Sequence, residues 1–188
     1  DDGVSADYSG LQYLSKILKT AKESEADIRL FIQPTHVYLL EVLNILGMMK
    51  SYEKWRHQLV DLVEVINKQY SEKPELSLWD FSGYNSVNVD KVPSLEEPNS
   101  SMDWYYDVGH FKKSLGDMIQ DRVFGYSDKE RDVPIDFGVQ INSKNIDLYH
   151  RTQRNKQTQY ILAHQEDIKE LADKVDLINK KIRQFDCG

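Results

Sequence analysis

Apolar side chains occur along the first 85 residues of the chain with two different spacings. Three segments have an apolar residue every three or four positions, which is the spacing of one face of an α-helix. Two short apolar runs lie among these segments, and each ends at a turn-forming pair, Gln-Pro or Ser-Gly. Short apolar runs between helices are typical of buried parallel strands, so the pattern predicts an α/β domain. The predicted elements are a helix over 8–23, a strand over 28–32, a helix that Thr35 caps and that ends near Gly47, a helix from about Ser51, and a strand over 76–81.

The pattern changes after the second predicted strand. Residues 85–103 are rich in proline, serine and asparagine, which predicts a long loop. A helix is predicted over 110–123, and residues 134–139 are predicted to form a short extended piece. Helical spacing then continues over 145–185, with a break near His164.

The second half of this C-terminal helical stretch carries apolar residues at alternating spacings of three and four. Such a seam suits a partner helix, although packing of a terminal helix on the chain's own domain is the simpler explanation. The sequence is therefore divided into an α/β portion, 1–126, and a loop with a C-terminal helical extension, 127–188. The seam residues are Ile168, Leu171, Val175, Ile178, Ile182 and Phe185.

Composition excludes several classes of function. The net charge of −7 offers no basic field for nucleic acid or for an anionic membrane surface. No apolar run approaches the length of a membrane span. The single cysteine, Cys187, excludes an internal disulfide framework and a cysteine-based metal site. The histidines and carboxylates lack metal-ligand spacing, and no glycine-rich phosphate loop is present, so no metal or cofactor is predicted.

A carboxylate and an imidazole stand three residues apart at Asp107 and His110. In acyl-transfer chemistry an acid orients a histidine, and the histidine takes a proton from a hydroxyl. The pair follows the long loop after the second strand, where α/β sheets bind ligands, and it is predicted to open a helix whose dipole favours the acid. The neighbouring aromatic residues, Tyr106 among them, are expected to restrict water around the pair.

Other polar residues follow the predicted strands. Asp80 and Ser82 lie at the end of the second strand, where they would contact a substrate or simply cap a turn. Ser82 has no Gly-x-Ser-x-Gly context, so it is not predicted to be a nucleophile. His36 follows the first strand and would either line the same cleft or satisfy the start of a helix. The remaining histidines, which lie among charged neighbours and are expected to be solvated, are His57, His150 and His164.

Several motifs together resemble a known family. Residues 31–36, 79–85 and 102–111 are similar, in composition and order, to the C-terminal half of bacterial SGNH/GDSL-hydrolase-like proteins of the cell envelope. The motifs at 115–117 and 136–139 and the helical tail fit the same resemblance, which covers nearly the whole chain. The resemblance implies a helix-rich, partial flavodoxin-like three-layer fold with few parallel strands and a long C-terminal tail.

In SGNH hydrolases an Asp-x-x-His pair completes a Ser-His-Asp triad, so the resemblance implies that Asp107 orients the base His110. The family's serine lies upstream in a Gly-Thr-Ser-Arg-like segment, which this sequence does not contain. The chain thus resembles the second half of a periplasmic or envelope esterase or O-acyltransferase. Such an enzyme would act on acylated carbohydrate or a similar small ester, and this part alone would be inactive.

The alternative is a non-catalytic binding or assembly module that keeps the hydrolase scaffold and contacts a partner through its C-terminal helix. An incomplete sheet would also expose a strand edge. Two copies of the chain would then associate through that edge or through the C-terminal helix.

Overall fold

A computed structural model describes residues 10–93, 99–127 and 129–186, with side chains described as far as Ile182. The seam residue Phe185 and Cys187 therefore have side chains outside the described part. The described chain is a mixed α/β structure, which confirms the α/β class predicted from the apolar spacing. Its helices are α1 (Gly10–Glu23), α2 (Val37–Ile45), α3 (Met49–Gln69), α4 (Lys113–Phe124), α5 (Ile146–Ala163) and α6 (Gln165–Asp186). Its strands are β1 (Leu30–Ile32), β2 (Leu78–Asp80), β3 (Tyr105–Asp107), β4 (His110–Phe111) and β5 (Val139–Ile141).

The main sheet has the strand order β1-β2-β5. β1 and β2 run parallel, with Leu30 opposite Leu78, as predicted for two strands separated by helices. β5 pairs with the other side of β2 in the antiparallel direction, with Ile141 opposite Leu78. The predicted extended piece is displaced towards the C-terminus, because residues 135–137 form a turn and the strand begins at Val139. The region predicted as an extension thus contributes a strand to the central sheet.

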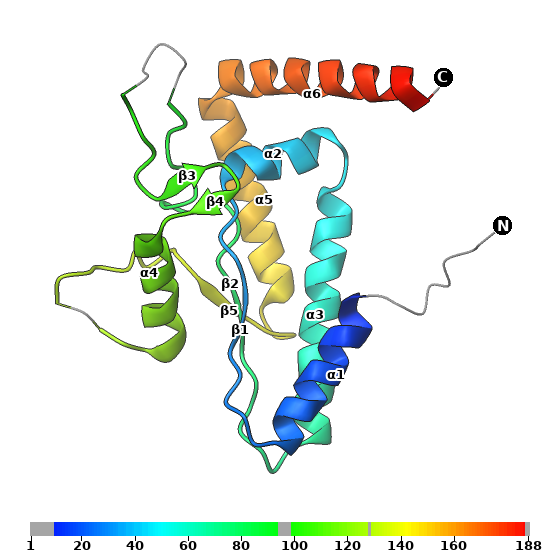
Figure 1. The fold of residues 1–188 in the computed structure, drawn as a ribbon, viewed down its shortest axis with the longest axis vertical. Coiled ribbons are helices and arrows are strands. Elements are labelled where there is room, and N and C mark those ends of the chain that lie inside the picture. The colour runs from blue at the N-terminus through cyan, green and yellow to red at the C-terminus, as the bar shows by residue number, and fades with distance from the viewer. Residues whose placement is uncertain (1–9, 94–98, 128, 187–188) are drawn as a thin grey trace.

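Helices lie on both sides of this sheet (Figure 1), with α4 on one side and α1, α3 and α5 on the other. Side chains alternate across the sheet, so Leu78 packs with the α1/α3/α5 layer whereas Trp79 and Phe81 pack on the α4 side. α3 illustrates why its sequence forms a helix here. Leu59, Val63 and Ile66 recur at helical spacing and all three are buried against the sheet.

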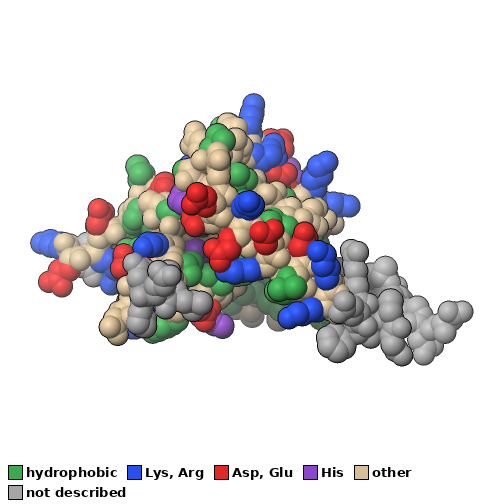
Figure 2. All heavy atoms as spheres, turned by 90° about the horizontal axis from the view of Figure 1, so that it is seen from above, with side chains coloured by type: hydrophobic (Ala, Val, Ile, Leu, Met, Phe, Trp, Pro, Cys, Tyr) green, Lys and Arg blue, Asp and Glu red, His purple; other side chains and the backbone are tan. Residues whose placement is uncertain are grey.

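The C-terminal helical stretch is divided in two, as predicted. α5 ends at Ala163, and the backbone N–H of His164 donates to the Tyr160 carbonyl. α6 turns away from α5 and lies above α2, which it contacts (Figure 1). Viewed from that end, acidic and basic side chains are interspersed over the surface (Figure 2).

One apolar stripe of α6 has two different environments. Leu171 and Val175 are buried, but Ile178 and Ile182, on the same stripe, are 56% and 53% exposed. The stripe thus packs on the chain's own domain in its first half and is uncovered in its second. The first half therefore packs on the chain's own domain, and contact of the second half with a partner stays a prediction.

Two predicted helix starts differ from the structure. The helix predicted from His110 begins at Lys113, because residues 105–111 form the β3–β4 hairpin instead. α2 is capped by His36 and not by Thr35: the His36 Nδ1 accepts the Tyr38 backbone N–H at 3.1 Å. In both places, contacts with distant residues select the local conformation.

Gly138 is expected to tolerate no side chain. Its φ is +83°, and a Cβ would lie 2.3 Å from the buried ring of Phe81. Gly138→Ala is expected to lower the free energy of unfolding by about 2 kcal/mol more than Gly47→Ala, because overpacking adds to the left-handed strain. Gly47 is the matched control, since its φ is +71° and its Cβ would meet open space. Urea denaturation measures both changes, and equal losses would show that Phe81 moves aside without cost.

Candidate functional site

The Asp107–His110 pair lies on the β3–β4 hairpin. The hairpin sits at the end of the sheet where the parallel strands finish, because the ring of Tyr105 packs edge-on against His36 at 5.2 Å. The Tyr105 hydroxyl also donates to Asn88, in the loop after β2, at 2.7 Å. The expected position beyond the strand ends is therefore present. The pair precedes α4 and does not open it, so no helix dipole supports the acid.

The geometry of the pair is that of an oriented imidazole. Both carboxylate oxygens of Asp107 lie 2.9 Å from the Nδ1 of His110. The carboxylate also accepts the Gly109 backbone N–H at 2.7 Å, in a turn that its own side chain closes. The Gly109 N–H and His110 lower the pKa of Asp107, so the acid is ionised at neutral pH. In a neutral imidazole, an ionised partner at Nδ1 favours the tautomer with the proton on Nδ1 and the lone pair on Nε2.

The pair is open to solvent. The side chains of His110 and Asp107 are 78% and 60% exposed, and Tyr106 is 73% exposed. The expectation that neighbouring aromatics restrict water is wrong for the described chain, because Tyr105 turns into the core. Alternation along β3 explains this result, since one tyrosine packs inward and the next faces outward. The Lys112 ammonium lies 6.0 Å from the Tyr106 ring centre.

His36 is buried beneath the hairpin. Its Nδ1 accepts the Tyr38 N–H, and its Nε2 lies 2.7 Å from the Asp90 carbonyl and donates to it. Burial lowers the pKa of His36, so the neutral ring satisfies both partners. Both ring nitrogens are thus used within the protein, and His36 supports the hairpin through Tyr105.

Asp80 and Ser82 belong to a separate buried network. The Asp80 carboxylate lies 2.7 Å from the Arg56 Nε, and it accepts the Ser82 N–H at 2.8 Å. The Ser82 hydroxyl donates to Asp80 and accepts from Arg56 at 2.7 Å and from Tyr52 at 3.0 Å. Burial raises the pKa of Asp80, against the opposing pull of Arg56. The network joins α3 to the end of β2, and the polar groups of Asp80 and Ser82 contact other members of the network.

Sequence reasoning missed Arg56 and Asn88, which organise this region. Arg56 stands three positions before Leu59, on the apolar face of α3, and that location is a signal of a buried charge. Asn88 is fully buried, donates to the Phe81 and Gly83 carbonyls and accepts from Tyr105. An asparagine in a loop gives no comparable signal, because only the folded chain surrounds it with partners.

The histidine expectations need one correction. His57 is partly exposed and lies 3.4 Å from Asp147. His150 is only 3% exposed, and its ring packs edge-on against His57 at 4.9 Å. The expectation that His150 is solvated is therefore wrong. Its charged sequence neighbours point elsewhere on α5, while His150 itself faces α3.

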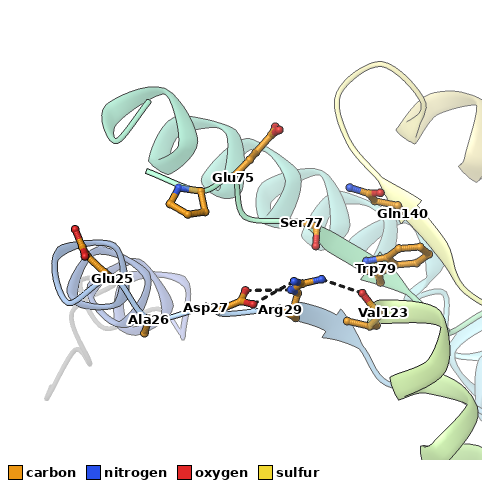
Figure 3. A pocket seen from close by; sticks show the side chains of 10 residues that line it. Glu25, Ala26, Asp27, Arg29, Glu75, Ser77, Trp79, Val123 and Gln140 are labelled. Atoms are coloured by element: carbon orange, nitrogen blue, oxygen red, sulfur yellow. Dashed lines mark hydrogen bonds and ion pairs between the residues drawn. The ribbon is translucent and has the colours of Figure 1, made fainter. Parts of the chain in front are cut away.

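A surface cavity lies away from all of these residues. It measures about 480 Å³ and opens at the amino ends of β1 and β2, the opposite end of the sheet from the hairpin (Figure 3). Arg29 crosses it, bound to Asp27 and to the Val123 carbonyl. No residue of the predicted site lines this cavity. Its lining comprises Glu25, Ala26, Asp27, Arg29, Pro74, Glu75, Ser77, Trp79, Val123 and Gln140.

The described side chains contain no group of three or more histidine, cysteine, aspartate or glutamate residues that would hold a metal ion. None of the described helices is both long enough and apolar enough to cross a bilayer. No protein-family model, curated protein or solved structure matches this chain.

Proposed function

We propose that this chain supplies the acid–base pair of an SGNH-like serine esterase or O-acyltransferase with a flavodoxin-like fold. The observation that carries the proposal is the contact of both Asp107 oxygens with the His110 Nδ1 at 2.9 Å, beside a solvent-exposed imidazole. Had the two side chains pointed apart, no carboxylate would orient the imidazole. The position beyond the ends of β1 and β2 supports the same assignment.

The proposed mechanism uses the two residues in fixed roles. His110 Nε2 accepts the proton of a serine hydroxyl while the serine oxygen attacks the acyl carbon. Asp107 holds the proton on Nδ1 and stabilises the imidazolium that forms. His110 then returns its proton to the leaving alcohol. The described residues place no hydroxyl in hydrogen-bond contact with Nε2, so we propose that the serine comes from a segment outside them.

The substrate class follows from the family resemblance. An acetylated envelope polysaccharide or similar ester would approach the exposed side of the hairpin, where Tyr106 offers an aromatic face. This proposal places the protein in the periplasm or cell envelope.

The test is hydrolysis of a chromogenic acetyl ester by this chain joined to its upstream serine-bearing segment. His110→Ala is expected to lower kcat at least about a hundredfold, because general-base catalysis is lost. His57→Ala is the matched control, since His57 is also a partly exposed histidine beside an aspartate, in the α3–α5 region. A rate that His110→Ala leaves unchanged would show that the assigned base is wrong.

A non-catalytic binding module is the second candidate. The uncovered half of the α6 stripe favours it, because exposed isoleucines at Ile178 and Ile182 suit a partner surface. Absence of ester hydrolysis in the joined protein, together with retained folding, would favour this candidate.

A further inference from the structure

The outer edge of β1 carries unused hydrogen-bonding groups. β1 is the end strand of the sheet. The Leu30 N–H donates to the Ser77 carbonyl, and the Ile32 carbonyl accepts the Phe81 N–H, so both residues direct backbone groups towards the β2 side. Along a strand these directions alternate, so the N–H and C=O of Phe31 point away from β2. None of the described residues pairs with them. Within β1 there is also no proline, lysine or bulge, the devices that usually protect an edge.

Apolar side chains accompany this open edge on both faces of the sheet. Phe31 is 47% exposed on the α4 side. On the other side, α1 exposes Tyr13 and Ile17, at 52% and 58%. Lys22 is buried and donates to the Pro74 carbonyl, so its flank of α1 faces the loop before β2. Tyr13 and Ile17 lie more than a third of a turn away from Lys22 around the helix, so they occupy the flank of α1 away from that loop.

We propose that this β1 surface, formed by Phe31, Tyr13 and Ile17, is the interface of a symmetric dimer of this chain. Two β1 strands related by a two-fold axis run antiparallel, and Phe31 of each copy exchanges both backbone hydrogen bonds with the other. The two main sheets become one continuous sheet of six strands. The two phenylalanine rings meet as a cross-strand aromatic pair, and the α1 helices flank the joint on the opposite face.

The charges near β1 fit a second copy. Arg29 is the one charged residue within 28–32, and it is already held by Asp27 at 3.1 Å. With Phe31 on the axis, Arg29 lies opposite Gln33 of the other copy. No like charges therefore face one another along the two paired β1 strands.

The exposed end of α6 is a poorer surface for self-association. Two adjacent basic residues, Lys180 and Lys181, stand among its apolar positions. An antiparallel pair of these ends would bring the basic residues of two copies together, and like charges at that range repel. The paired β1 strands themselves carry no such repulsion.

Light scattering during size-exclusion chromatography tests the proposal on the full chain. The native protein is expected to be a dimer that dissociates on dilution. Phe31→Lys and Ile17→Lys are expected to raise the dimer Kd at least about tenfold, because each places a charge in the joint. Ile17→Lys changes only a helix surface position, so it remains informative if Phe31→Lys disturbs the fold.

The double variant Ile178→Glu, Ile182→Glu is the matched control and should leave the dimer intact. Slow amide exchange at Phe31 that accelerates on dilution would support pairing at β1. A native chain that stays monomeric at every concentration would overturn the proposal. Dissociation by the α6 variant, with the two β1-surface variants still dimeric, would overturn it as well.

Discussion

Arg56→Ala is expected to lower the free energy of unfolding by about 3–5 kcal/mol. The substitution leaves the Asp80 carboxylate in the core without its cation, and Asp80 is only 1% exposed. It also removes a donor to the Ser82 hydroxyl and the cation over the Tyr52 ring, 4.1 Å away. An uncompensated buried charge is among the few changes that cost this much.

Arg154→Ala is the matched control. Arg154 also donates to a carboxylate, Glu53, at 2.7 and 2.8 Å, but its side chain is 54% exposed. Water screens such a pair, so the loss should stay below about 1 kcal/mol. Urea midpoints at constant m-value measure both losses, and similar losses would show that Asp80 finds another partner when Arg56 is removed.

The double variant Arg56→Met, Asp80→Asn tests how much of the lost stability comes from leaving one buried charge unpaired. Removing both charges is expected to cost less than the sum of the two single changes, because neither charge is then left alone. The single Arg56→Ala loss should also shrink at lower pH, since burial raises the pKa of Asp80 and the carboxyl can take up a proton.

Acid is expected to destabilise the α3–α5 contact through His150. Burial and the nearby Arg56 lower the pKa of His150 to about 4, from an ordinary value of 6.5. Between these two values the unfolded chain binds a proton that the folded chain does not. The stabilisation is therefore complete above pH 6.5 and falls as the pH drops to 4. The total loss is about 3 kcal/mol, at 1.36 kcal/mol for each pKa unit.

The pH dependence of the unfolding free energy measures this effect. His150→Phe keeps an aromatic ring against His57 and removes the titrating nitrogen, so the slope between pH 4 and 6.5 should decrease by up to one proton. Arg56, His57 and Arg154 disfavour the charged ring and Glu53 favours it. His57→Gln is the control for that cluster, because the side chain of His57 is 40% exposed. An unchanged slope in His150→Phe would assign the acid lability to other groups.

The candidate site was partly predictable because part of it is local. Asp107 and His110 stand three residues apart, so a short turn brings them together whichever element surrounds them. Their openness to solvent was not predictable, since it depends on which neighbouring aromatic packs inward. Tyr105 packs inward because its hydroxyl bonds to Asn88 and its ring packs against His36, and both of these residues come from distant loops.

Strongly periodic segments were predictable for a similar reason. The helix spacing around α3, the break at His164 and the two parallel strands all reflect patterns within a few residues. β5 was harder, because a three-residue strand gains its pairing only from β2 across the sheet. The start of α4 was misplaced for the same reason, since a hairpin competed with the helix.

The sequence by itself determined the α/β class, the order of the main helices and strands, and the pairing of Asp107 with His110. These depend on apolar spacing and short-range geometry, which any stretch of chain carries with it. The tertiary structure alone decided which polar groups are buried: it placed Arg56 against Asp80, turned His150 inward and left β1 at the edge of the sheet. Burial is a property of the surrounding elements, so no local pattern contains it.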